Sequence, residues 1–81
     1  MSTPTPAEQL ATDMLQRCAK LSARERDVLI LSSKGLTTAE AGKALGLSTH
    51  TVADHRKHLF RKLDVTNIVE AAVIAAKAGL V

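Results

Sequence analysis

The residues best suited to chemistry lie in one short segment, LSTHTVADHRKHLFRKL, which runs from Leu47 to Leu63. This segment holds all three histidines of the chain, four cations and a single acid, Asp54. Residues of these types can ligate a metal ion, bind the phosphates of a polyanion, or form the solvated face of a helix. The spacing of the side chains and the rest of the sequence distinguish these three interpretations.

A metal site would depend on His55 and His58, which lie one helical turn apart and could share an ion with Asp54. Two histidines do not make a closed site, and no cysteine or clear third ligand is placed nearby. No nucleophile, base and orienting acid occur together, and no glycine-rich phosphate loop follows a strand. We therefore predict no metal site, no cofactor and no enzymatic activity, and interpret His55 as a hydrogen-bonded structural residue.

The excess positive charge of the chain is concentrated in the same segment. Residues 48–63 carry four cations against one acid, whereas the remainder of the chain carries seven cations and seven acids. A basic stripe is the expected electrostatic footprint of a phosphate-binding surface, and a solvated helix face is the alternative. Phe60 is the only aromatic residue, which argues against proteins that stack single-stranded bases on aromatic rings.

Length and composition predict one small intracellular domain. A chain of 81 residues is close to the size at which a single hydrophobic core is only just sufficient. The N-terminal stretch resembles no secretory signal, and no apolar run approaches membrane-spanning length, so no membrane partner is expected. Cys18 is the only cysteine; it fits a reducing cytoplasm and is predicted to be a small core residue.

Capping signals divide the chain into five predicted helices, and nothing alternates with the period of a strand. In four of them a capping residue is followed three positions later by glutamate, which is the capping-box pattern. The pairs are Thr5 and Glu8, Ser22 and Glu25, Thr37 and Glu40, and Asn67 and Glu70. The predicted fold class is all-α, with helices over 6–20, 23–34, 38–45, 49–63 and 68–78.

The predicted helix 49–63 differs from the others because Ser48 caps it but no acid follows in its first turn. Free N–H groups and the helix dipole favour an anion at such a terminus, where an acid would repel a phosphate. At about 100° per residue, its apolar side chains face inward. The outward face resembles that of a helix in the DNA major groove; it gathers His50, Asp54, Lys57 and Arg61, with Ala53 and His58 at its edges.

The preceding segment adds a helix-turn-helix pattern. Gly42 lies inside the short helix 38–45, Gly46 follows that helix, and Val52 lies six residues further on. Two helices that cross steeply over a short turn need a tiny residue where they touch, a glycine at the turn, and an apolar plug from the second helix. A glycine inside a helix costs roughly 1 kcal/mol relative to alanine, so Gly42 indicates a steric requirement.

Taken together, these motifs resemble the DNA-binding domain of LuxR-type regulators, also called the GerE or NarL/FixJ type. The matching pieces are LSARERDVL, GLTTAE, LGLSTHTVADH and LFRKLDV, in that order, between Leu21 and Val65. The resemblance implies a four-helix bacterial domain over 21–81 that reads double-stranded DNA with helix 49–63. Residues 1–20 would then be an N-terminal extension with an additional amphipathic helix.

The resemblance also implies roles for individual residues. Phosphate contacts fall on Thr38, Ser48, Thr49 and Thr51, and base-edge contacts on Ala53, Asp54 and Lys57. His50 and His58 are expected at the groove edge or on the plain surface, and Arg61 and Lys62 against the DNA backbone. The chain departs from the family where lysine is usual at Ala53, a large aliphatic residue at Ala41, and glycine at Asp64.

The last predicted helix, NIVEAAVIAAKA, is apolar around most of its circumference. We expect one side to close the core and the alanine-rich side to pair with a second copy, giving a homodimer on two half-sites. The alternative is a helix buried deep in the monomer. The expected dimer contacts are Ile68, Ala71, Ala72, Ala75 and Ala76.

The first predicted helix carries an apolar stripe of Leu10, Met14, Cys18 and Leu21. It is expected to extend the dimer, pack on the domain, or join another domain. The sequence thus predicts a dimeric, sequence-specific DNA-binding transcriptional regulator of the bacterial nucleoid. The alternative is a protein-binding module of the same fold, acting as an anti-activator or RNA polymerase partner, which Ala53 and Asp54 favour.

Overall fold

The computed structural model describes residues 2–81, which form five α-helices and no strand. The all-α prediction is confirmed, and each predicted helix exists with bounds that differ by at most two residues. The first ends at Cys18 and not at residue 20, because the chain turns there toward the buried Leu21. The helices are α1 (Pro6–Cys18), α2 (Ala23–Ser33), α3 (Thr38–Leu45), α4 (Thr49–Leu63) and α5 (Ile68–Lys77).

Every helix begins at the predicted capping residue, whose side-chain oxygen accepts a hydrogen bond from the backbone N–H three positions later. The reciprocal bond, in which the backbone N–H of the capping residue donates to the glutamate carboxylate, forms at Ser22–Glu25 and Thr37–Glu40. At α5, Glu70 accepts from the backbone N–H of Thr66 instead, one residue before the cap. Local sequence therefore specifies where the helices begin, as expected from the free N–H groups of a first turn.

The core lies where α2, α4 and α5 meet. Its largest fully buried side chains include Val28 and Leu29 of α2 and Leu59 and Leu63 of α4. Cys18 of α1 is also fully buried, which confirms its prediction as a core residue. Burial raises the pKa of its thiol, and the charge of Arg26 offsets only part of this effect, so the thiol stays protonated at neutral pH.

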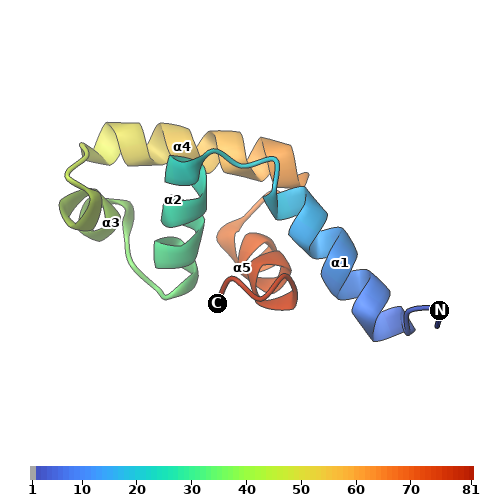
Figure 1. The fold of residues 1–81 in the computed structure, drawn as a ribbon. Helices are drawn as coiled ribbons and strands as arrows, with labels where there is room; N and C mark the ends of the chain where they lie inside the picture. The colour runs from blue at the N-terminus through green and yellow to red at the C-terminus, as the bar shows by residue number, and fades with distance from the viewer. Residues whose placement is uncertain (1) are drawn as a thin grey trace.

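The helix-turn-helix prediction is confirmed in detail at the α3–α4 pair (Figure 1). Gly46 ends α3 with a φ of +69°, a left-handed conformation that glycine adopts without steric cost. Gly42 is buried, and a Cβ at this position would lie 2.6 Å from the carbonyl oxygen of Leu47 in the turn. Val52 is fully buried as the apolar plug from α4. The steric requirement indicated by the sequence is thus real.

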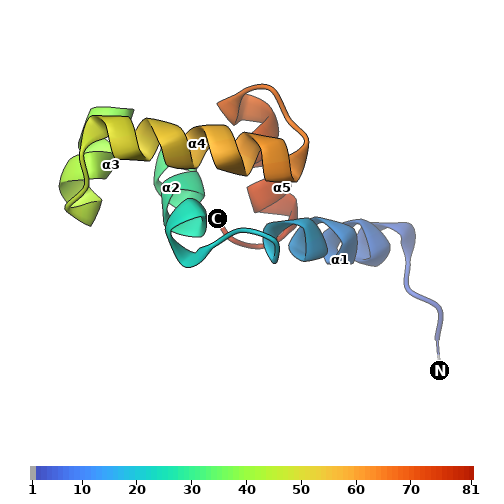
Figure 2. The ribbon, with the colours of Figure 1, turned by 90° about the horizontal axis from the view of Figure 1, so that it is seen from above.

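The molecule is elongated, with extents of 48 × 20 × 20 Å, because α1 projects from the body (Figures 1 and 2). The α3–α4 corner lies at one end and the start of α1 at the other. The predicted stripe on α1 is only partly covered: Cys18 and Leu21 are buried, Met14 is half-buried, and Leu10 is 40% exposed. Within residues 2–81, no helix has both the length and the apolar character needed to cross a membrane.

Candidate nucleic-acid interface

The outward face of α4 carries the predicted polar stripe. His50, Ala53, Asp54, Lys57 and Arg61 are all exposed, whereas Val52, Leu59 and Leu63 on the opposite side are buried. The helical phase derived from the sequence is therefore confirmed. Fifteen residues of uninterrupted helix hold these side chains in fixed register along a rod of about 22 Å.

The start of α4 lies beside the turn that leaves α3. Ser48 caps the helix by accepting a hydrogen bond from the backbone N–H of Thr51, and its hydroxyl donates to Thr51 Oγ1 at 2.9 Å. No acid occurs in this first turn, whereas each of the other four helices has one there. Ser48 and Thr49 are exposed, so this positive helix end is open to an anion.

The structure brings Thr38 of α3 close to the α4 stripe. Thr38, Ala53 and Lys57 together line a shallow hollow between the two helices, along with Arg56 and Phe60. The guanidinium carbon of Arg56 lies 5.6 Å from the centre of the Phe60 ring. This cation–π contact orients a charged group at the edge of the interface, and the four-residue spacing of the pair was the signal for it.

Asp54 is the one acid on this face. Its carboxylate lies 3.5 Å from Nε2 of His50, one turn earlier, and 54% of the Asp54 side chain is exposed. An exposed pair of this kind contributes little to stability, so both side chains remain available to a ligand. A carboxylate can accept from the N4 amino group of cytosine and repels phosphate, so Asp54 suits a base edge.

Two predicted DNA contacts have another partner in the structure. Lys62 Nζ donates to Oε1 of Glu25 in α2 at 2.6 Å, and His58 Nδ1 lies 4.0 Å from Oε2 of the same carboxylate. The ammonium group of Lys62 is thus paired with a buried carboxylate, although 41% of the Lys62 side chain is exposed, and its predicted contact with the DNA backbone stays a prediction. His58 lies on this same side of α4.

The sequence predicts Glu25 only as a capping residue, but the structure also pairs it with Lys62. Burial alone raises the pKa of its carboxyl, but hydrogen bonds from Lys62 and the Ser22 backbone, with the charge of Lys62, outweigh burial and lower the pKa. The ionised carboxylate thereby ties the beginning of α2 to the last turn of α4. Glu25 fixes the orientation of α4 from inside the domain.

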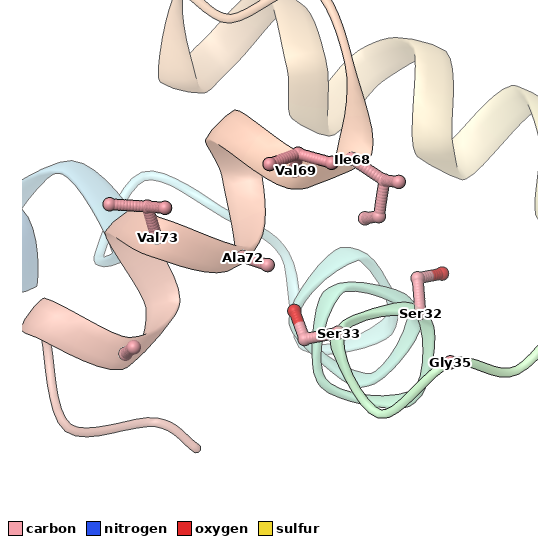
Figure 3. A pocket seen from close by; sticks show the side chains of 8 residues that line it. Ser32, Ser33, Gly35, Ile68, Val69, Ala72 and Val73 are labelled. Atoms are coloured by element: carbon pink, nitrogen blue, oxygen red, sulfur yellow. The ribbon is translucent and has the colours of Figure 1, made fainter.

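The residues predicted for a dimer contact divide into two groups. Ala71 and Ala75 are fully buried in the monomer core, so they offer no surface to a second copy and that part of the prediction is wrong. Ile68, Ala72 and Ala76 instead line an apolar groove of about 380 Å³ between α5 and the end of α2, together with Val69 and Val73. Figure 3 shows Ile68 and Ala72 of α5 directed toward Ser32 and Ser33 of α2, with Val69 and Val73 further from α2.

The described part of the chain, residues 2–81, contains no group of three histidine, cysteine, aspartate or glutamate side chains placed to hold a metal ion. The arrangement offers instead a helix terminus open to anions, an exposed basic rod, and a neighbouring helix whose first turn borders it. A short helix, a tight turn and an exposed second helix supported by a third define the helix-turn-helix class.

Comparison with known proteins identifies the family within this class. The family described as "Bacterial regulatory proteins, luxR family" matches residues 19–75, and the chain belongs to it. The chain is 43% identical over 63 residues to the transcriptional activator protein SolR of Ralstonia nicotianae, covering 78% of this chain and 27% of that protein. It is 39% identical over 54 residues to the nitrate/nitrite response regulator protein NarL of Escherichia coli, covering 67% of this chain and 25% of that protein. The chain thus spans about a quarter of the length of these relatives.

Proposed function

We propose that the chain is a sequence-specific, double-stranded DNA-binding transcriptional regulator that lays α4 in the major groove. The observation that carries this proposal is the exposed face of α4, where cations, an acid and a small side chain share one fixed register. In this proposal residues 21–81 form the DNA-binding domain and 1–20 an extension, and the protein works in the bacterial nucleoid.

Phosphates and bases have separate partners in this proposal. Ser48, Thr49 and Thr51 contact a phosphate at the open start of α4, and Thr38 contacts the backbone from the neighbouring helix. Arg61 binds a second phosphate. Arg56 joins the phosphate contacts because it lines the same hollow as Thr38. The base edges are read by the exposed side chains of α4 that remain, namely His50, Ala53, Asp54 and Lys57.

The protein acts as a homodimer whose contact includes the α5 groove. Val69 is 70% exposed and Val73 46% exposed, although such apolar side chains are normally covered when they cluster. The Oγ atoms of Ser32 and Ser33, at the α2 side of the groove, are buried without a hydrogen-bond partner within residues 2–81. A second copy seated there would cover the valines and bring polar groups to these hydroxyls.

Selection of random duplex DNA by the purified chain at near-physiological salt, followed by sequencing, tests the proposal. An enriched palindrome with half-sites about one helical turn, or 34–36 Å, apart is expected. Arg17→Ala serves as a control, because it removes one exposed cation that lies on α1 and not on the α4 face. Lys57→Ala should alter the selected sequence, whereas the control should leave it unchanged.

The competing function is a protein-binding module of the same fold, acting as an anti-activator or a partner of RNA polymerase. Asp54 favours it, because an exposed acid in the middle of the basic face repels phosphates. Absence of any enriched sequence, together with duplex binding that does not weaken as salt rises, would support this second function.

A further inference from the structure

The large exposed hydrophobic side chains of residues 2–81 are confined to two helices and the C-terminal residue. Every one of them lies on α1, on α5 or at the C-terminal residue, and none lies on α2, α3 or α4. Apolar side chains scattered singly are ordinary, but a group gathered on two adjoining helices marks an interaction surface. The five are Leu10, Leu15, Val69, Val73 and Val81.

The apolar face of α1 continues beyond the point where the domain covers it. At about 100° per residue, Ala7 and Ala11 point in nearly the same direction as Cys18, with Leu10 and Leu15 on either edge. Cys18 is fully buried, whereas Ala7, Ala11, Leu10 and Leu15 are all exposed. The first turns of α1 therefore project past the body with their apolar side uncovered (Figure 2).

The direction of this face shows where its partner would lie. The last turns of α1 pack on α5 through the same side that is uncovered in its first turns. A molecule that covers Leu10 and Ala7 therefore lies beside α5. A second copy seated on the α5 groove occupies that region.

The size of the α5 groove also indicates that a second copy contacts α1. Eight residues line it, whereas a stable protein–protein interface uses about 20–30 residues and about 800 Å² from each partner. The groove alone is too small for a stable dimer. The uncovered face of α1 is the adjoining apolar surface that can supply the rest.

We propose that α1 is a dimerisation arm: the uncovered face formed by Ala7, Leu10, Ala11 and Leu15 packs against a second copy of this chain, beside the α5 groove. This inference rests on the dimer of the proposed function and assigns a role to a helix that lies outside the region matched to the family, residues 19–75. Under two-fold symmetry each arm contacts the other copy, so the interface gains two equivalent contacts.

Sedimentation equilibrium of the full chain without DNA tests this inference. Leu10→Glu and Leu15→Glu place a charge on the uncovered face, and Gln16→Glu, an exposed neighbour on the polar side of α1, adds the same charge elsewhere. Each leucine variant is expected to weaken the dimerisation constant by about tenfold or more. Gln16→Glu should stay within about twofold of the unmodified chain, and far-ultraviolet circular dichroism should show the same helical content in all four proteins.

Val73→Glu separates the two halves of the interface, because it alters the α5 groove without touching the arm. Weakening by all three substitutions supports the inference. If Val73→Glu disrupts the dimer while the leucine variants match Gln16→Glu, or if the unmodified chain is monomeric at high concentration, the inference is overturned. These measurements contain no DNA, so their failure is distinct from failure of the DNA selection, which would overturn the proposed function itself.

Discussion

Replacing Gly42 with alanine tests the contact that sets the angle between α3 and α4. Alanine is the better helix former by roughly 1 kcal/mol, so propensity alone predicts a more stable protein. In the structure, however, the new Cβ would lie 2.6 Å from the carbonyl oxygen of Leu47, where ordinary contact begins at 3.4 Å. The obstacle is backbone and cannot rotate away.

The size of the effect follows from these distances. The helix and the turn have to separate by about 0.8 Å to reach ordinary contact from 2.6 Å, and the 2.8 Å hydrogen bond from Leu47 N–H to Gly42 O resists that movement. Overpacking costs about 1–3 kcal/mol, and weakening the hydrogen bond costs up to about 1 kcal/mol. After the gain in propensity of roughly 1 kcal/mol, we expect a net loss of up to about 3 kcal/mol. Each kcal/mol corresponds to about 4–8 °C in melting temperature.

Thermal and urea unfolding followed by circular dichroism measure this loss. Ala44→Gly, at an exposed position of the same short helix, is the matched control, because it reports propensity alone and should cost about 1 kcal/mol. Gly42→Ala should also weaken DNA binding at temperatures where the protein is folded, since the turn that moves carries the start of α4. A higher melting temperature for Gly42→Ala would refute the reasoning.

Three further predictions concern α4 and its surroundings. The pKa of Glu25 is lowered from the ordinary 4.5, so the ionised carboxylate stabilises the fold fully above pH 4.5, and this stabilisation is lost as the pH falls through the folded-state pKa. Glu25→Gln should therefore cost about 1–3 kcal/mol at pH 7. It should also reduce the loss of stability at acid pH, as measured by urea titration. Asp64 ends α4 in the left-handed conformation, with a φ of 56°, so Asp64→Gly should raise the free energy of unfolding by about 1 kcal/mol. Asp64→Asn removes only the charge at the negative end of the helix and should give a smaller gain. An unchanged melting temperature for both variants would contradict this. Lys57→Ala should weaken specific binding by about 1–3 kcal/mol and relax preference at one base pair, measured by competition between duplexes, and equal weakening on all sequences would assign Lys57 to a phosphate.

Features specified by neighbouring residues could be predicted from the sequence. Ser22 and Glu25 cap α2 through a bond between positions three apart, and Gly46 closes α3 through its own backbone conformation. The inward position of Val52 follows from helical periodicity, as does the outward position of Lys57. Such signals act within one or two turns of helix, so no knowledge of the tertiary packing was needed.

Contacts between distant residues could not be predicted in the same way. Glu25 and Lys62 are 37 positions apart, and an exposed lysine on a basic helix gave no sign that it would be held by α2. Periodicity also failed on α5, because a helix that is apolar nearly all round has no polar face to fix its phase. The sequence therefore predicts Ala71 and Ala75 as dimer contacts, although both are fully buried in the monomer.

The independence of the α4 surface from the core has a consequence for evolution and engineering. Four side chains of this surface are exposed: His50, Ala53, Asp54 and Lys57. Among them, His50 and Asp54 form a weak ion pair. The buried Val52, Leu59 and Leu63, with the Glu25–Lys62 bond, hold the helix without them. A library randomised at these four positions without proline or glycine should therefore retain the fold in nearly every member. New operator preferences could then be reached by single substitutions without passing through unfolded intermediates.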